Sequence, residues 1–159
     1  MIFTINILML LLLSWIFYED TKDRKVTLVV LLSLIVVGGY LNFQEQITML
    51  FLLSSLINLG VVFIVVLLLF LYSKIKLKSS LFRVFGMGDL LFFIFMSVSF
   101  PTTTFLVLFS VSLIFSLMIS LLFQKKFQNM VPLAGLQALF LILIIGANTL
   151  LNVVNLYEL

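Results

Sequence analysis

The chain has 159 residues, of which 64% are hydrophobic and only 9% are charged, and its formal net charge is +3. A soluble domain of this size needs a polar shell, so the composition excludes one and indicates a protein that lies in a membrane. The chain contains no cysteine and no histidine, which excludes disulfides, thiolate zinc sites, cysteine nucleophiles and a histidine general base.

Long apolar runs predict an all-α, polytopic integral membrane protein that forms a single domain over residues 1–159. A helix needs about 20 apolar residues to cross a hydrocarbon core of about 30 Å. Six runs come close to this length, at about residues 2–18, 26–43, 47–72, 81–100, 105–123 and 131–151. The fourth run is interrupted by Arg83 and by Gly86-Met87-Gly88-Asp89. Short connections between the runs favour a compact helical bundle.

The basic residues indicate the orientation of these spans. All nine fall in the connections that follow the first, third and fifth runs: Lys22, Arg24, Lys25, Lys74, Lys76, Lys78, Arg83, Lys125 and Lys126. The other connections hold Glu45 and the uncharged segment 101–104. Because cytoplasmic loops are enriched in Lys and Arg, both termini are expected to be extracytoplasmic. The basic residues therefore indicate membrane orientation, and we do not expect a nucleic-acid partner.

Two aspartates are placed where a charge is costly. A helix from Asp89 to Phe100 covers only about 16 Å, so Asp89 is expected inside the cytoplasmic half of the bilayer. Asp20 lies about 27 Å along the first helix, near the cytoplasmic boundary. An ionisable residue at membrane depth is a functional candidate. The two aspartates therefore approach one membrane face from two different helices.

Gly86 and Gly88 flank Asp89 with positions that lack a side chain. Glycines allow the backbone to leave helical geometry and allow another chain to approach closely. Irregular backbone at this depth is tolerated where it is buried in protein or lines a wet cavity, which is an environment that peptide hydrolysis requires. The structural alternative is that residues 86–89 form a loop entering the fourth span, with Asp89 capping its N-terminus.

Three segments together resemble a known family. They are residues 20–26 (Asp-Thr-Lys-Asp-Arg-Lys-Val), 86–89 (Gly-Met-Gly-Asp) and 131–139 (Val-Pro-Leu-Ala-Gly-Leu-Gln-Ala-Leu). In order, spacing and topology they are similar to the type IV prepilin peptidases and preflagellin peptidases, which are Gly-x-Gly-Asp aspartyl proteases of the membrane. The resemblance implies that Asp20 and Asp89 are the catalytic pair, supported by Gly86 and Gly88.

The resemblance also implies the substrate and the location. The substrates would be pilin-like precursors, whose leader peptide is cut at the cytoplasmic face of the inner (cytoplasmic) membrane. Many bacterial relatives of this kind carry a zinc-binding loop with four cysteines and methylate the new terminus. This chain has no cysteine, so it resembles a minimal peptidase core, and neither methyltransferase activity nor any metal or organic cofactor is expected. The sequence makes no prediction of the oligomeric state.

The chain departs from the family pattern at several positions. Thr27 stands where the family usually has proline, and Leu28 where it often has asparagine. Leu91 stands where many members have lysine, and residues 133–135 follow the final-helix pattern only loosely. These departures bear on substrate preference and on activity rather than on the fold.

Two carboxyl groups that share a site cannot both ionise cheaply, so such a pair holds one proton at neutral pH. The ionised partner can deprotonate a water while the protonated partner polarises the scissile carbonyl. Asp89 is expected to be the more desolvated group and the proton holder. Glu19 and Asp23 compete with Asp20 for its role. Asp23 is expected to be a solvated loop charge and Glu19 a boundary residue facing lipid headgroups.

The remaining expectations concern packing and lipid. Lys74, Lys76 and Lys78 alternate with aliphatic residues, which indicates attraction to anionic lipid and, less directly, a contact for substrate. The polar residues inside spans are expected to form interhelical hydrogen bonds: Ser54, Asn58 and Asn148. Gly38, Gly39, Gly60 and Gly146 are expected to permit close helix contact. The eighteen phenylalanines are expected to face lipid.

Two other functions remain open from sequence. One is an intramembrane aspartyl protease of the presenilin or signal-peptide-peptidase kind, which shares Gly-x-Gly-Asp but has about nine spans. Cleavage of a leader, as opposed to cleavage within the bilayer, distinguishes it from the leader peptidase. The other is a small transporter or a non-catalytic scaffold in which Asp89 binds an ion or a proton, and a separation of the Asp20 and Asp89 carboxyl groups too large for one shared water would favour it.

Overall fold

The computed structural model describes residues 2–77, 86–123, 132–151 and 156–157. Within them the chain forms six α-helices: α1 (Ile2–Asp23), α2 (Leu28–Glu45), α3 (Thr48–Tyr72), α5 (Met87–Ser99), α6 (Thr102–Leu122) and α8 (Leu133–Leu151). One π-helical turn, η1 (Ser73–Leu77), extends α3. The described residues contain no strand. The predicted all-α polytopic membrane fold is therefore confirmed.

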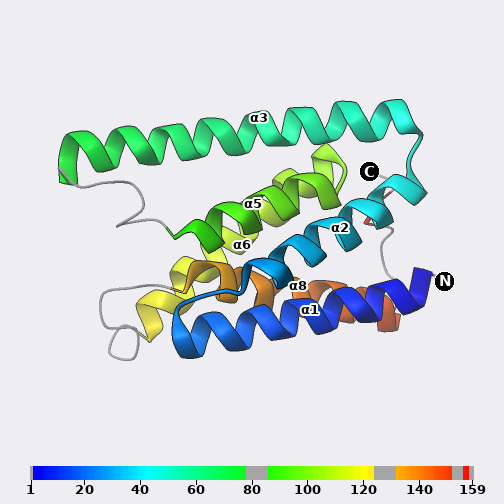
Figure 1. Ribbon diagram of the computed structural model, residues 1–159, viewed down its shortest axis with the longest axis horizontal. Coiled ribbons are helices and arrows are strands. Elements are labelled where there is room, and N and C mark those ends of the chain that lie inside the picture. The colour runs from blue at the N-terminus through cyan, green and yellow to red at the C-terminus, as the bar shows by residue number, and fades with distance from the viewer. Residues whose placement is uncertain (1, 78–85, 124–131, 152–155, 158–159) are drawn as a thin grey trace.

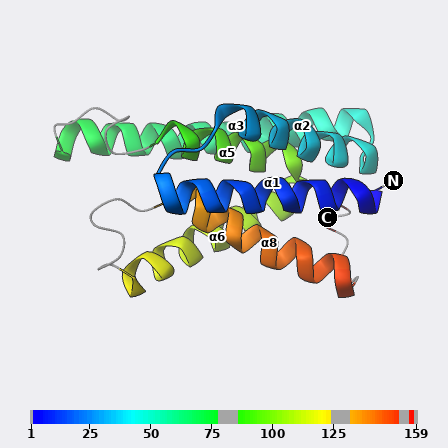
Figure 2. The ribbon, with the colours of Figure 1, turned by 60° about the horizontal axis from the view of Figure 1, so that its bottom comes forward.

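Consecutive helices run in opposite directions, so the chain passes up and down the bundle (Figure 1). The turn between α1 and α2 and the C-terminal end of α3 lie at one end, whereas the start of α1, the end of α8 and the α2–α3 turn lie at the other. α1 packs against α8 and α2, and α5 packs against α2 and α3. Figure 2 shows α6 and α8 on one side of α1, and α2, α3 and α5 on the other. α1 thus lies between these two groups of helices, and α3 and α5 also contact α6 directly.

Four helices are long and apolar enough to cross a membrane, namely α1, α2, α3 and α6. α5 and α8 are shorter apolar helices. α5 has only 13 residues and begins at Met87, later than the predicted fourth span. Residues 81–85 of that span lie outside the described residues.

α1 continues to Asp23, beyond the apolar run that ends near Tyr18, so Asp20 lies within the first helix as expected. One predicted boundary was wrong. The predicted connection 101–104 reduces to Phe100 and Pro101, because α6 already begins at Thr102. Pro101 serves as the N-cap residue, and its carbonyl accepts the Phe105 N–H at 2.8 Å. Proline is tolerated at a helix start because the N–H groups there have no partner within the helix.

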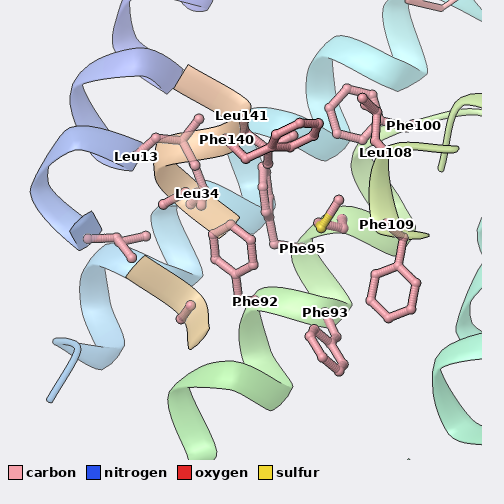
Figure 3. Packing of buried hydrophobic residues seen from close by; sticks show 14 of the residues in the cluster. Leu13, Leu34, Phe92, Phe93, Phe95, Phe100, Leu108, Phe109, Phe140 and Leu141 are labelled. Atoms are coloured by element: carbon pink, nitrogen blue, oxygen red, sulfur yellow. The ribbon is translucent and has the colours of Figure 1, made fainter. Parts of the chain in front are cut away.

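Phenylalanines form much of the core, which corrects the expectation that they all face lipid. Phe92, Phe95 and Phe100 of the α5 region have 0% exposure, and Phe93 has 1%. In Figure 3, Phe92 and Phe95 lie close to Leu34 of α2. The Phe93 ring meets the ring of Phe109 of α6 edge-on, with centroids 4.9 Å apart. Because α5 buries aromatic rings toward both α2 and α6, it is the central helix of the bundle.

Glycines bring α2 close to α5. A Cβ on Gly38 would collide with the Ser99 side chain and lie 2.7 Å from Phe95 Cε2, and one on Gly39 would lie 3.0 Å from Val98 Cγ1. These two glycines therefore do permit close helix contact, as predicted. Gly60 and Gly146 do not, because a Cβ at either position would meet nothing within 4 Å among the described residues.

Candidate active site

The two aspartates singled out from the sequence bind consecutive backbone amides at the start of α8. The Gly135 N–H donates to Oδ2 of Asp20 at 2.6 Å, and the Ala134 N–H donates to Oδ1 of Asp89 at 2.8 Å. The first N–H groups of a helix have no partner within the helix, and the helix dipole favours negative charge there. The N-terminus of α8 therefore acts as a common anchor for two carboxyl groups from different helices.

Asp20 reaches this anchor because α1 packs along α8. Asp20 lies near the C-terminal end of α1 and is buried, with 7% of its surface exposed. A Cβ on Gly135 would lie 3.0 Å from both Cβ and Oδ2 of Asp20, which is tighter than ordinary contact. Glycine at position 135 therefore gives the Asp20 carboxylate room to approach the backbone.

Asp89 reaches the anchor from the first turn of α5. Its Oδ2 accepts the N–H of Gly86, the N-cap residue of α5, at 3.2 Å. Asp89 therefore caps the N-terminus of α5 through Oδ2, which is the structural alternative that the sequence left open. Oδ1 is nevertheless bound to α8, 45 residues along the chain. A Cβ added to Gly88 would lie 3.6 Å from the Val26 side chain, so residue 88 also faces the segment that leads into α2.

The hydrogen bonds bring the two carboxyl groups into one site. Since neighbouring backbone nitrogens are joined by only three bonds, the two bound oxygens lie within about 9 Å of each other. Asp20 and Asp89 are also close enough to interact electrostatically. Asp89 is partly exposed. That Asp89 holds the shared proton stays a prediction.

One carboxyl oxygen of the pair is open. Oδ1 of Asp20 accepts no hydrogen bond from the described part of the chain, and it is not among the buried, unpartnered polar atoms there. It therefore keeps some accessible surface, whereas both oxygens of Asp89 accept amide N–H groups. The side chain of Arg24 is close enough to Asp20 to interact with its charge. The site thus combines an open oxygen, a neighbouring carboxyl group and a nearby cation.

The structure separates Asp20 from the acidic residues that competed with it. Glu19 accepts hydrogen bonds from the Thr27 backbone N–H at 2.7 Å, the Thr27 hydroxyl at 2.8 Å and the Trp15 indole at 2.9 Å. Its carboxylate therefore ties the end of α1 to the start of α2, a contact that the sequence did not predict. Asp23 is exposed, as predicted.

Glu19 also gives Thr27 a structural role. Thr27 is the N-cap of α2, and its backbone N–H is used in the bond to Glu19. Proline, the residue usual at this position in the family that the sequence resembles, has no N–H to donate. The departure at Thr27 therefore fits the local structure, whereas nothing in the structure explains the departure at Leu91.

Of the basic residues singled out as lipid or substrate contacts, the structure describes the side chain of Lys74. Lys74 is exposed in η1, with its Nζ 5.8 Å from the centroid of the Phe70 ring. The side chain of Lys76 and the whole of Lys78 lie outside the described residues. No group of three or more acidic or cysteine residues that could hold a metal ion occurs among residues that the structure describes.

The sequence did not reveal the part played by α8. Ala134 and Gly135 contribute backbone N–H groups, which have no signature in a sequence. The signals available were Pro132 just before the helix, which is typical of a helix start, and a glycine in the first turn. No known protein family, curated protein or solved structure matches this chain.

Proposed function

We propose that this protein is an aspartic endopeptidase of the cytoplasmic membrane that removes the leader peptide of type IV pilin-like precursors at the cytoplasmic face. The observation that carries the proposal is the binding of Asp20 and Asp89 to the consecutive amides of Gly135 and Ala134. The resemblance of residues 20–26, 86–89 and 131–139 to the prepilin and preflagellin peptidases supports the substrate class. The positive-inside distribution of Lys and Arg supports the orientation.

The chemistry proposed is hydrolysis by a pair of carboxyl groups that share one proton. The ionised group takes a proton from a water, whose oxygen attacks the carbonyl carbon of the scissile bond. The protonated group donates its proton to the carbonyl oxygen. When the tetrahedral intermediate collapses, the C–N bond breaks and a proton passes to the leaving nitrogen, so that the products are a carboxylate and an amine.

The hydrogen bonds suggest how the pair divides this work. Oδ1 of Asp20 is the oxygen that is open to a water or a carbonyl group. Asp89 is fixed by amides from both α5 and α8, which restricts its rotation. Fixing one carboxyl group while the other keeps an open oxygen reduces the entropy lost when the reacting atoms are brought together.

The test is cleavage of a pilin-like precursor by the purified protein in lipid nanodiscs. Asp20→Asn and Asp89→Asn are each expected to lower the rate at least about 100-fold, because each removes a proton-transferring group. Asp23→Asn is the matched control, because Asp23 is exposed on the same stretch of chain and should cleave like the wild type. All three proteins should unfold at similar temperatures.

Full activity in either of the first two variants would overturn the proposal. Cleavage within the membrane-spanning segment of the substrate, rather than at the leader junction, would favour the presenilin-like alternative. A well-folded wild type that cleaves no precursor, but releases or takes up an ion through Asp89, would favour the transporter alternative.

A further inference from the structure

Four buried oxygen atoms have no hydrogen-bond partner among the described residues, and they lie on α3, on the end of α5 and on the start of α6. They are Ser55 Oγ, Asn58 Oδ1, Ser99 Oγ and Thr104 Oγ1, and the described residues contain only one more such atom, Gln137 Oε1. Buried polar groups in proteins are almost always paired, so these unpaired oxygens indicate a missing partner.

The inward face of α3 is polar, although the helix is otherwise apolar. Its buried residues are Ser55, Asn58 and Val62, whereas its leucines and phenylalanines are mostly exposed. Asn58 lies about 15 Å along the helix from Thr48, which is about half the thickness of a hydrocarbon core. A polar residue at that depth is costly unless it binds something.

Asn58 binds the end of α5. Its Nδ2 donates to the carbonyl oxygens of Ser97 and Phe100, each at 2.9 Å, so its Oδ1 carries the unpaired lone pairs. Exchanging the amide oxygen and nitrogen would not help, because Oδ1 would then face two carbonyl oxygens. Asn42 of α2 donates to the Val98 carbonyl at 2.9 Å. The last turn of α5 is thus held by two asparagines, one from α2 and one from α3.

Asn58 Oδ1 is an acceptor only and therefore lacks a donor or a cation, whereas the three hydroxyls also offer free lone pairs. The C-terminal end of a helix carries partial negative charge, which favours a cation. Unwound backbone carbonyls and helix C-termini inside membranes are also known places for sodium ions. A hard monovalent ion suits neutral hydroxyl, amide and carbonyl oxygens, whereas divalent ions favour carboxylates.

We propose that the buried turn between α5 and α6 binds a monovalent cation, with sodium as the best fit. Asn58 Oδ1, the hydroxyls of Ser55 and Thr104 and the carbonyl oxygens of Ser97 and Phe100 are the groups that would hold it. Ser99 is left out because its hydroxyl faces Gly38 of α2. The ion would stabilise the turn that sets the position of α5, and this role is independent of the proposed peptidase activity.

The test is the melting temperature of the purified protein in nanodiscs as sodium chloride replaces choline chloride at constant ionic strength. Sodium is expected to raise Tm by about 4 °C between zero and about 300 mM, because a ligand that binds only the folded state stabilises it. Thr104→Val removes one hydroxyl without changing shape and should abolish most of this shift. Thr103→Val is the matched control, since Thr103 is exposed on the adjacent position.

The Tm of Thr104→Val in choline alone reports whether the variant folds, so a lost sodium shift cannot be mistaken for unfolding. Ser55→Ala provides a second variant on a different helix and should reduce the shift as well. Equal melting temperatures in sodium, potassium and choline would overturn the proposal and leave water as the partner of these oxygens. A sodium shift that persists unchanged in both Thr104→Val and Ser55→Ala would also overturn it.

Discussion

Gly135→Ala is the substitution that examines most sharply how α8 positions the carboxyl pair. It keeps the backbone N–H that binds Asp20 but adds a methyl group 3.0 Å from both Cβ and Oδ2 of Asp20. Ordinary contact requires 3.4 Å or more, so the Asp20 carboxyl group must retreat by about half an ångström. The change therefore alters position without removing any hydrogen-bonding group.

The expected effect follows from the sensitivity of catalysis to position. A displacement of about 1 Å costs about 100-fold in rate, so half that distance should lower kcat/KM for precursor cleavage about tenfold, or about 1.4 kcal/mol. Gly146→Ala on the same helix is the control, because an added Cβ there meets nothing within 4 Å. The control should cleave normally and melt at the same or a higher temperature, because alanine favours helix over glycine.

The assay is steady-state cleavage of a pilin-like precursor by each protein in nanodiscs, with Tm measured in parallel. If Gly135→Ala cleaved as fast as the wild type while Asp20→Asn was inactive, the catalytic geometry of Asp20 would not depend on α8. That result would refute the proposed anchoring of the pair by the Gly135 and Ala134 amides.

Two further substitutions test the packing around the site. Glu19→Leu should lower Tm by about 3–6 °C, because it removes the two hydrogen bonds that join Thr27 to α1 and one to Trp15 within α1, and its precursor cleavage should remain measurable. A Glu19→Leu protein that melts like the wild type would show that this contact contributes nothing to stability. Gly38→Ala should destabilise the protein by about 1–3 kcal/mol, because the methyl group collides with Ser99, whereas Gly60→Ala should be tolerated. Equal unfolding midpoints for the Gly38 and Gly60 variants would contradict the close α2–α5 packing.

The sequence predicted the fold well because lipid imposes a simple rule on composition and length. Six apolar runs became six helices, although α1 ran further than the apolar residues alone indicated. A helix can continue past Tyr18 into charged residues because its backbone bonds do not depend on apolar side chains. The shortness of α5 was less predictable, since its ends are set by Asp89 on one side and by Asn42 and Asn58 on the other.

The candidate site was only partly predictable. Asp20 and Asp89 were identified from depth, glycine neighbours and family resemblance, and the structure brings them to one helix N-terminus. The convergence itself could not be derived from the sequence, because the groups that hold both carboxylates are backbone amides. The role of Glu19 was also missed, since its partner Thr27 lies eight residues away across a turn whose path the sequence did not reveal.

Asparagine and glycine residues inside spans illustrate the same limit. Asn58 was expected to bond across helices, and it does, but its partners are carbonyl groups at the end of α5. Gly38 and Gly60 look alike in sequence, yet only Gly38 meets a neighbouring helix. Which face of a helix meets protein and which meets lipid depends on the packing of the whole bundle, and in an almost uniformly apolar sequence no local pattern reveals it.

The central claim, that Asp20 and Asp89 meet at the start of α8, can be tested directly by cross-linking. The natural chain has no cysteine, so an Asp20→Cys, Asp89→Cys double variant carries only the two thiols of interest. A bismaleimide with a span of about 8 Å should join them in nanodiscs in high yield, and mass spectrometry of the digested protein would identify the linked peptides. An Asp20→Cys, Gly146→Cys pair should remain unlinked, because Gly146 lies about 17 Å further along α8 than Gly135. Failure of the first pair to cross-link in folded protein, or equal yields for both pairs, would contradict the shared site.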